Sequence, residues 1–183
     1  PAQAAPIASL LRNEDVIGIM PTGAGKSICF QIPALCKAGL TIVFSPLISL
    51  MKDQVDGLLV QNIPAALINS TLTQAEFNKT MYEVRSGKIK LLYIAPERLG
   101  SNFFCNVLRA LPIAQVIVDE AHCISEWGHD FRPSYRLIGE WLNSLPKRPI
   151  VGAFTATATK YVENDIKKLL GLDNANVYVT GFD

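Results

Sequence analysis

The chain lacks several features that mark particular classes of protein. No apolar run approaches the roughly 18 consecutive residues that a membrane-spanning helix needs, and the first residues do not form a signal peptide. The four cysteines include no C-x-x-C pair, which argues against a zinc site and indicates reduced, mostly buried thiols. We therefore expect a cytoplasmic protein that has no membrane anchor and no zinc site in these residues.

An excess of charge of one sign is also missing. The chain has 17 lysines and arginines against 16 aspartates and glutamates, which gives a net charge of +1. Proteins that hold polyanions mainly by charge are usually more basic, so this balance argues neither for nor against a nucleic-acid partner.

The length and composition suit one compact unit. A chain of 183 residues with 49% hydrophobic content is enough for one well-packed domain, whereas two domains would be cramped. Internal repeats, linkers and low-complexity segments are all missing, so we expect a single domain over residues 1–183. Neither Pro1 nor Asp183 looks like a natural terminus, and we expect a fragment of a longer protein.

Short apolar runs alternate with amphipathic segments along the chain. In one such segment Ile48, Met51 and Val55 share a helix face, and in another Thr73 and Glu76 form a capping box. The apolar runs are mostly continuous, which is typical of strands buried on both faces. This alternation predicts an α/β fold with a parallel sheet sandwiched between helices, and ligands at the carboxyl ends of its strands. The six expected strands cover residues 16–20, 40–45, 90–95, 115–119, 150–155 and 176–180.

A glycine-rich segment follows the first expected strand. It reads MPTGAGKS over residues 20–27 and departs from the phosphate-loop pattern G-x-x-x-x-G-K-[ST] only at Met20. Its glycines would let backbone N–H groups surround phosphate oxygens, and the helix that follows adds its positive end. Lys26 would reach the β- and γ-phosphates of ATP, and the Ser27 hydroxyl would bind Mg²⁺. The expected ATP-binding residues here are Thr22, Gly23, Ala24, Gly25, Lys26 and Ser27.

Two adjacent carboxylates follow the strand at residues 115–119. Asp119 ends the strand, where its carboxylate could hold Mg²⁺ directly or through water. Glu120 comes next, points differently, and is well placed to orient and deprotonate an attacking water. The two acids could instead cap the following turn, and the phosphate loop could be an ordinary turn with an exposed lysine. Together, however, the two motifs predict phosphoryl transfer to water, with Lys26, Asp119 and Glu120 as the catalytic residues.

An aromatic-rich loop follows the carboxylate pair. Residues 119–135 read DEAHCISEWGHDFRPSY, and residues 119–136 carry four acids against two arginines, so this is not a basic patch. Trp127 and Phe131 could stack on nucleobases beside His129, with Arg132 as the local cation, at roughly 1–3 kcal/mol per base. Alternatively, Trp127, Phe131 and Tyr135 could be core residues of a compact loop.

His122 also falls in this segment. We expect His122 to bridge motifs or make a local hydrogen bond rather than bind a metal.

Other strand ends carry polar residues that suit phosphate contacts. Small hydroxyls and a helix N-terminus in residues 45–54 could bind a nucleic-acid backbone, although a simple Ser-Pro helix start explains them equally well. Residues 69–71 and 95–98 raise the same question. The threonines of residues 155–159 could report the state of the nucleotide or merely cap the next helix. The candidate contacts are Ser45, Pro46, Ser49, Lys52, Asn69, Ser70, Glu97, Arg98, Thr155 and Thr157.

Taken together, these motifs resemble the first RecA-like lobe of a RecQ-family DNA helicase of superfamily two. The family's motif I resembles MPTGAGKS, its motif Ia SPLISLMKDQV, and its motif III FTATAT. Its motif II and aromatic-rich loop resemble DEAHCISEWGHDFRPSY, and a further strand-binding motif resembles YIAPERL. The resemblance covers nearly the whole chain, Met20 is the family's usual variant, and Gln3 looks like the tail of a motif that lies near the adenine.

The resemblance implies a RecA-like P-loop NTPase domain that acts with ATP and Mg²⁺. The whole enzyme would move 3′ to 5′ on single-stranded DNA and unwind partly duplex DNA in recombination and repair, at the nucleoid if the source is bacterial. A second RecA-like lobe of the same full-length chain would complete the site, so we expect this fragment to be nearly inactive alone. Two alternatives stay open, namely a DEAH-type RNA helicase lobe and a non-catalytic, nucleotide-dependent binding module.

Overall fold

The computed structural model describes residues 2–21 and 25–180, which form one parallel sheet covered by helices on both faces. All six strand pairings are parallel, in the order β3-β4-β2-β5-β6-β1-β7. The strands are β1 (Val16–Ile19), β2 (Leu40–Phe44), β3 (Ala65–Ile68), β4 (Leu91–Ile94), β5 (Ile113–Val118), β6 (Ile150–Thr155) and β7 (Asn176–Val179).

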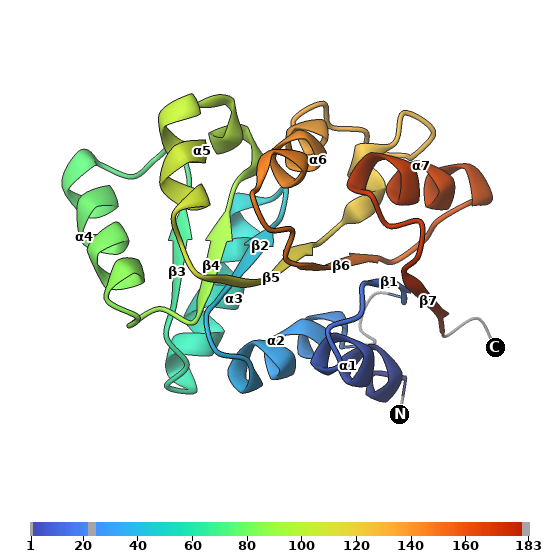
Figure 1. Cartoon of the computed structure of the whole chain (residues 1–183), viewed down its shortest axis with the longest axis horizontal. Helices are drawn as coiled ribbons and strands as arrows, with labels where there is room; N and C mark the ends of the chain where they lie inside the picture. The colour runs from blue at the N-terminus through green and yellow to red at the C-terminus, as the bar shows by residue number, and fades with distance from the viewer. Residues whose placement is uncertain (1, 22–24, 181–183) are drawn as a thin grey trace.

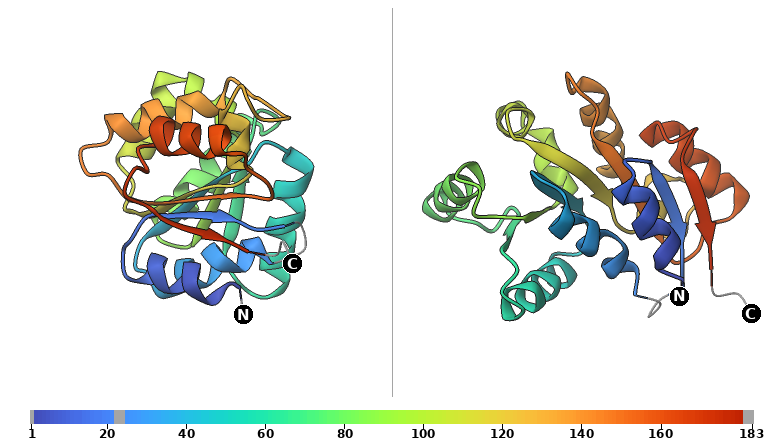
Figure 2. Two further views of the ribbon diagram at one scale, coloured as in Figure 1. Left: turned by 90° about the vertical axis from the view of Figure 1, so that its right-hand side faces the viewer. Right: turned by 60° about the horizontal axis from the view of Figure 1, so that its bottom comes forward.

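Two layers of helices enclose the sheet. The first comprises α1 (Ala4–Leu11), α2 (Lys26–Cys36) and α3 (Ile48–Val60). The second comprises α4 (Gln74–Arg85), α5 (Asn102–Arg109), α6 (Tyr135–Ser144) and α7 (Lys160–Leu170). Figure 1 shows the two layers on opposite faces, and the left view of Figure 2 shows the sheet between them. Two short 3₁₀ turns, η1 (Pro96–Gly100) and η2 (Ala121–Ile124), follow β4 and β5.

The continuous apolar strands explain this layering. Successive side chains of a strand point to opposite faces, so a strand covered on both sides needs apolar residues at every position. In β2, Ile42 and Phe44 belong to the core beneath α4–α7, whereas Val43 belongs to the core beneath α1–α3. All three are fully buried. The predicted sheet sandwiched between helices is therefore confirmed.

The predicted strand list was wrong in one respect, because it omitted β3. This strand pairs only with β4, at one edge of the sheet, and its two central residues, Ala66 and Leu67, are only partly buried. Alanine is a poor strand former, and an edge position is less apolar than a central one. The short segment Ala65–Ile68 therefore carries a weaker signal than the central strands.

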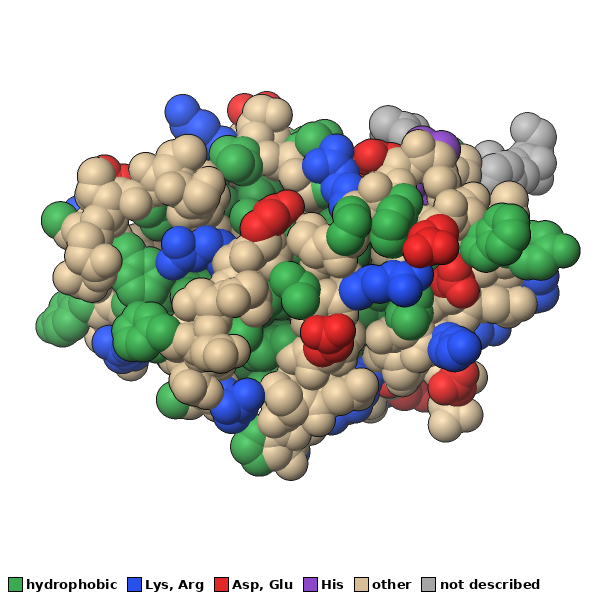
Figure 3. Space-filling model, turned by 90° about the horizontal axis from the view of Figure 1, so that it is seen from above, with side chains coloured by type: hydrophobic (Ala, Val, Ile, Leu, Met, Phe, Trp, Pro, Cys, Tyr) green, Lys and Arg blue, Asp and Glu red, His purple; other side chains and the backbone are tan. Residues whose placement is uncertain are grey.

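The outer surface shows no concentration of one charge over the second helical layer. Basic and acidic side chains are interspersed on the face seen from above (Figure 3), in keeping with the net charge of +1. Of the helices in the described residues, none is both long enough and apolar enough to cross a membrane.

Candidate functional site

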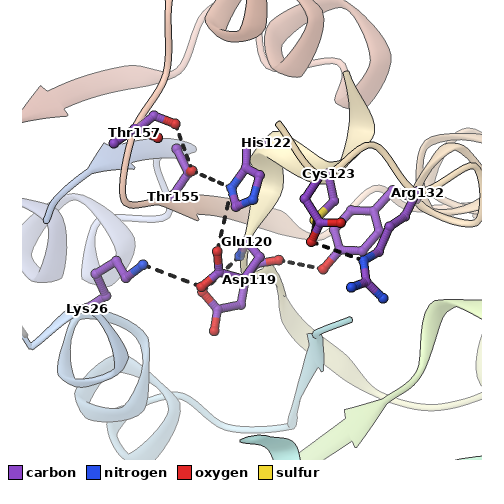
Figure 4. Close-up of polar contacts among 10 residues, drawn as sticks. Lys26, Asp119, Glu120, His122, Cys123, Arg132, Thr155 and Thr157 are labelled. Carbon is purple, nitrogen blue, oxygen red and sulfur yellow. Dashed lines mark hydrogen bonds and ion pairs between the residues drawn. The ribbon is translucent and has the colours of Figure 1, made fainter. Parts of the chain in front are cut away.

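The carboxyl ends of the parallel strands bring most of the predicted site residues to one edge of the sheet. Lys26 and Ser27 begin α2, just after β1, while Asp119 follows β5 and Thr155 ends β6. Because β1, β6 and β5 are neighbours, these residues converge (Figure 4). Thr22, Gly23 and Ala24 lie outside the described residues.

Gly25 ends the phosphate loop in a conformation that favours glycine. It precedes α2 with φ of 73° and ψ of 38°, in the left-handed region that a side chain disfavours. A Cβ atom here would also lie 2.8 Å from Nε2 of Gln3. Gln3 therefore lies against Gly25 at the end of the loop.

Glu120 stands between two partners at the centre of the site. Its Oε1 lies 3.6 Å from Lys26 Nζ, and its Oε2 lies 3.5 Å from His122 Nδ1 (Figure 4). The Glu120 backbone is left-handed, with φ of 50° and ψ of 46°, which is rare for a residue with a side chain. This turn sends Glu120 in a different direction from Asp119, as predicted.

Asp119 is buried and held from three sides. Its Oδ1 accepts a 2.9 Å hydrogen bond from the Glu120 N–H, and its backbone carbonyl accepts a 2.7 Å bond from the Tyr135 hydroxyl. Burial and the negative Glu120 raise the pKa of Asp119 to about 6, although Lys26 and the Gln54 side chain act in the opposite direction. A buried carboxylate whose pKa stays raised in spite of Lys26 suits a divalent cation, which prefers such oxygen ligands.

His122 joins the ends of β5 and β6. Its Nδ1 lies 2.7 Å from Thr155 Oγ1, and this hydroxyl in turn donates to the Thr157 carbonyl over 3.0 Å. Burial lowers the pKa of His122 more strongly than Glu120 raises it, so the ring is neutral at neutral pH. The contact with Glu120 is thus a polar contact, not an ion pair. The expectation that His122 bridges motifs is confirmed.

The aromatic-rich loop divides between the two predicted interpretations. Tyr135 is fully buried and belongs to the core, whereas the Trp127 side chain is largely exposed, at 71%. The Trp127 ring packs against the ring of Tyr161 in α7, with centroids 5.6 Å apart and planes at 31°. Tyr161 is also exposed. Phe131 is half-buried beneath the guanidinium of Arg136, which lies 5.4 Å from its ring centroid.

Hydrogen bonds tie the loop to the rest of the domain at its base. Ser125 Oγ donates to Asp165 of α7 over 2.7 Å and accepts from the Trp127 N–H over 3.1 Å. The backbone N–H of Arg132 donates a 2.8 Å hydrogen bond to the Cys123 carbonyl. The loop therefore projects from a hydrogen-bonded base at the end of η2.

One contact links this loop directly to the cluster formed by Lys26, Glu120 and His122. The His129 ring stacks on His122, with centroids 4.5 Å apart and planes at 17°. A chain of contacts thus runs from Lys26 through Glu120 and His122 to His129, two residues from Trp127.

Metal-ligand atoms also gather beneath the loop. His122, Cys123 and Asp130 each offer one such atom, and these atoms all lie within 4.8 Å of one another. Burial, together with the nearby Asp130, raises the pKa of Cys123 to about 12. The sulfur is consequently a protonated thiol that faces the Asp130 carboxylate, with Sγ 3.9 Å from Oδ2.

The remaining candidates extend along the same edge. Pro46 is half-buried, and Ser49 and Lys52 are exposed on the first turns of α3. Ser45 is buried, and its Oγ has no hydrogen-bond partner among the described residues. The start of α3 thus presents polar groups just after β2, beside β5 in the sheet.

Two candidate pairs lie farther from the phosphate loop. Asn69 and Ser70 follow the edge strand β3, and Glu97 and Arg98 follow β4, so β2, β5 and β6 separate both pairs from β1. The Asn69 Oδ1 accepts from Thr71, which orders its own turn.

Arg98 and Glu97 each have partners within the domain. The guanidinium of Arg98 lies 5.4 Å from the ring centroid of Phe77 and 4.9 Å from that of Phe104, so it packs on aromatic rings. Glu97 accepts a 3.3 Å hydrogen bond from Ser134 at the end of the loop.

The sequence interpretation missed two residues that shape the site, Gln54 and Tyr161, and named Tyr135 only as a possible core residue. Gln54 and Tyr135 both bond to Asp119, and Tyr161 supports Trp127. Each reaches its partner only through the packing of separate elements, for which sequence spacing holds no signal.

Comparison with known proteins agrees with this geometry. The DEAD/DEAH box helicase family matches residues 1–165. The ATP-dependent DNA helicase RecQ of Bacillus subtilis is 54% identical over 90% of this chain, which spans 28% of that relative. The corresponding protein of Pasteurella multocida is 47% identical over 97% of this chain, again spanning 28% of the relative. The chain therefore spans less than a third of the length of these curated relatives.

Solved structures share the fold at low identity. The helicase domain of Pyrococcus furiosus Hef superposes with a TM-score of 0.74 at 17% identity, covering 97% of this chain and 37% of that one. The helicase MrfA bound to DNA gives 0.75 at 14% identity, covering 98% of this chain and 25% of that one. With the parallel sheet, the converging Lys26, Asp119 and Glu120, and the family match over residues 1–165, the chain belongs to the DEAD/DEAH box helicases.

Proposed function

We propose that this chain is the ATP-binding lobe of a RecQ-like DNA helicase, which couples ATP hydrolysis to 3′ to 5′ translocation on single-stranded DNA and to duplex unwinding. The observation that carries the proposal is the run of contacts from Lys26 through Glu120 and His122 to His129. It joins a nucleotide-type site to an exposed aromatic loop, and such a connection is what coupling requires.

On the nucleotide side, each residue has a distinct role. Lys26, now 3.6 Å from Glu120, would turn to the β- and γ-phosphates of ATP. Ser27 and Asp119 would hold Mg²⁺, which when bound supplies positive charge against the phosphate oxygens. Glu120 would accept a proton from the water that attacks the γ-phosphorus, while ADP leaves with the electrons of the broken bond.

His122 would act as a positioning residue. The Nδ1 atom of its neutral ring contacts both Glu120 and Thr155, so a change in either partner would move the imidazole. Since His129 stacks on that ring, a nucleic-acid strand bound to the loop would alter the placement of the catalytic carboxylate.

On the DNA side, Trp127 offers the main stacking surface. Its exposed ring lies beside that of Tyr161, and together they present two aromatic faces at the carboxyl edge. Bases stack on such rings with little dependence on sequence, as a translocating protein requires. The exposed polar groups of Ser49 and Lys52 would contact the backbone of the strand.

The proposal extends to partners. A second RecA-like lobe of the full-length chain would supply an arginine finger, which contributes about 10³–10⁵-fold in rate. The domain over residues 1–183 would therefore hydrolyse ATP very slowly by itself. We propose no structural zinc at His122, Cys123 and Asp130, because these three ligands fall short of the four that such a site uses. The protein would act in the cytoplasm, at the nucleoid in a bacterium, in recombination and repair.

ATP turnover in the full-length protein tests the proposed function. Single-stranded DNA should stimulate hydrolysis more than RNA of the same sequence, and Lys26→Ala should abolish both basal and stimulated turnover. Stronger stimulation by RNA would instead favour a DEAH-type RNA helicase. Nucleotide binding without any turnover in the wild type would favour a non-catalytic binding module.

A further inference from the structure

A cavity of about 870 Å³ lies at the edge of the sheet opposite the nucleotide site. It is lined by the turns that lead into β2, β5 and β6, together with Asn13 at the end of α1. All the strands are parallel, so these turns stand at the amino ends, whereas Lys26 and Glu120 stand beyond the carboxyl ends. The cavity is thus separate from every group assigned above.

The lining of this cavity carries charge of one sign. Lys37, Arg109, Lys147 and Arg148 contribute to it, and no aspartate or glutamate does. The rest of the chain has 13 lysines and arginines and 16 aspartates and glutamates. Without these four cations its net charge would therefore be negative. None of the four forms an ion pair with a carboxylate within residues 2–21 and 25–180.

Neutral acceptors fix three of these cations in place. The Lys37 ammonium donates to Asn13 Oδ1, and partial burial lowers the pKa of Lys37. The two Nη atoms of Arg109 donate to Asn106 Oδ1 over 2.6 Å and to Ser144 Oγ over 3.1 Å. Such contacts position a cation without neutralising it.

The two guanidinium groups still have positive charge to offer. Arg109 Nε is buried and has no hydrogen-bond partner among the described residues. Arg148 Nη2 donates to the Leu170 carbonyl at the end of α7 over 2.6 Å, which anchors the side chain by a neutral oxygen. Charge that is held in place and left uncompensated favours an anionic ligand.

We propose that this cavity is a second ligand site, which binds phosphate groups. Four cations in one cavity match a ligand with several negative charges, and guanidinium groups match phosphate oxygens in pairs. The volume is that of a typical small-ligand pocket, and apolar side chains such as Leu111, Leu145 and Ile150 would cover a sugar or base. A free nucleotide and a nucleic-acid backbone share this chemistry. The site does not depend on hydrolysis at Lys26.

Calorimetric titration with pyrophosphate tests the site in a Lys26→Ala background, which removes the main cation of the phosphate loop. We expect pyrophosphate to bind this variant. Adding Lys37→Gln and Lys147→Gln should then weaken binding by about tenfold or more, because each lost phosphate contact is charge-assisted. The absence of pyrophosphate binding in the Lys26→Ala background would overturn the proposal.

The matched control neutralises two cations elsewhere. Lys79→Gln and Arg85→Gln remove the same charge from exposed positions on α4, so they should leave pyrophosphate binding nearly unchanged. Equal losses in both double variants would mean that only overall charge matters, and the site would be refuted. Arg109→Gln provides a second test inside the cavity, with thermal unfolding as the check that the variant folds.

Two further titrations identify the ligand. If ADP binds the Lys26→Ala background more tightly than a short single-stranded oligonucleotide does, the source of phosphate is a free nucleotide. The reverse order points to a nucleic-acid strand. Equal binding of succinate and pyrophosphate would contradict a phosphate site. In the full-length protein with Lys26 intact, Lys37→Gln with Lys147→Gln should leave basal ATP hydrolysis unchanged, so failure of this site and failure of the helicase proposal remain distinguishable.

Discussion

The two halves of the segment after β5 differ sharply in burial. Residues 121–125 are all buried, with Ala121, Cys123, Ile124 and Ser125 fully enclosed, whereas none of residues 126–134 is buried. The first half packs against the sheet beside Asp119. The second half reaches into solvent and ends at the buried Tyr135. One short stretch of chain therefore contains both a buried region, beside the proposed catalytic carboxylates, and an accessible one.

The contrast explains how one segment can serve two ligands. The buried half keeps Glu120 and His122 in place through packing, which resists small displacements. The exposed half is hydrogen-bonded at its base through Ser125 and Arg132, and its aromatic side chains remain accessible to a ligand. The stacked rings of His122 and His129 are where the halves meet. Substitutions on either side should therefore affect different steps of the reaction.

The largest effect should come from Glu120→Gln, at the residue just before the buried half. In the full-length protein we expect ATP to bind with little change, while hydrolysis falls by about 10²–10⁴-fold because the general base is lost. Single-turnover hydrolysis and equilibrium binding of a fluorescent ATP analogue would measure the two quantities separately. Glu126→Gln, in the exposed half, is the matched control and should retain turnover. Loss of ATP binding in Glu120→Gln would argue against the role of a base.

Asp119→Asn should affect the stability of the buried half, in a way that depends on pH. The pKa of Asp119 is about 6 in the folded domain against an ordinary 3.8. Between these values the folded state keeps a proton that the unfolded state releases, so rising pH lowers the stability of the wild type. The full cost, on the order of 3 kcal/mol for two pKa units, applies above pH 6.

Without metal, Asp119→Asn should therefore unfold at a higher temperature than the wild type at pH 7.5. Near pH 3.5 the unfolding temperatures of the variant and the wild type should be equal. Thermal unfolding in EDTA measures this difference. Asp53→Asn, at an exposed position of α3, should show no such gain. Added Mg²⁺ should stabilise the wild type selectively. A variant less stable than the wild type at pH 7.5 would contradict the raised pKa.

Trp127→Ala tests the exposed half. Loss of a stacking surface worth roughly 1–3 kcal/mol should weaken binding of single-stranded DNA at least fivefold. Stimulation of ATP hydrolysis by DNA should fall with it, while basal hydrolysis stays nearly constant. ATP hydrolysis measured across a range of DNA concentrations gives both quantities. Equal losses in basal and stimulated turnover would mean that Trp127 supports the packing of the loop instead.

The central strands and the edge strand β7 were predictable from sequence, whereas the edge strand β3 was not. The strands at β2, β5 and β6 are apolar at nearly every position because helices cover both faces, and such runs are conspicuous. The capping box at Thr73 was equally local, and its Oγ1 accepts from the Glu76 N–H over 3.1 Å. The edge strand β3 has alanines and a partner on one side only, so its sequence shows little of its place in the sheet.

The site was predictable where its residues lie close together in the chain. Asp119 and Glu120 are adjacent, and they directly follow the apolar residues of β5, so the sequence alone places them at the end of that strand. By contrast, the contacts of Gln54 and Tyr161 join helices to segments far away in sequence. Only the folded arrangement determines those distances, so no pattern within one segment could indicate them.

The smallest predicted effect concerns Tyr161, the partner of Trp127 across the loop. An aromatic pair contributes about 0.5–1.5 kcal/mol beyond its buried area. Tyr161→Ala should therefore weaken binding of single-stranded DNA only a few-fold, and Tyr161→Phe should restore it, since the ring and not the hydroxyl makes the contact. The chain has two tryptophans, and Trp141 is buried, so a Trp141→Phe background leaves Trp127 fluorescence as a specific reporter.

Titration of that background with DNA would also decide how the two rings work. If they form one stacking surface, Tyr161→Ala weakens DNA binding and leaves the quenching of Trp127 by bound bases in place. If Tyr161 instead occupies the position of a base, its removal strengthens binding, because the strand no longer competes with a neighbouring ring. Tighter binding would thus reject the shared surface and make the exposed half of the loop a self-occupied site, unlike the buried half, which packs beside the two carboxylates.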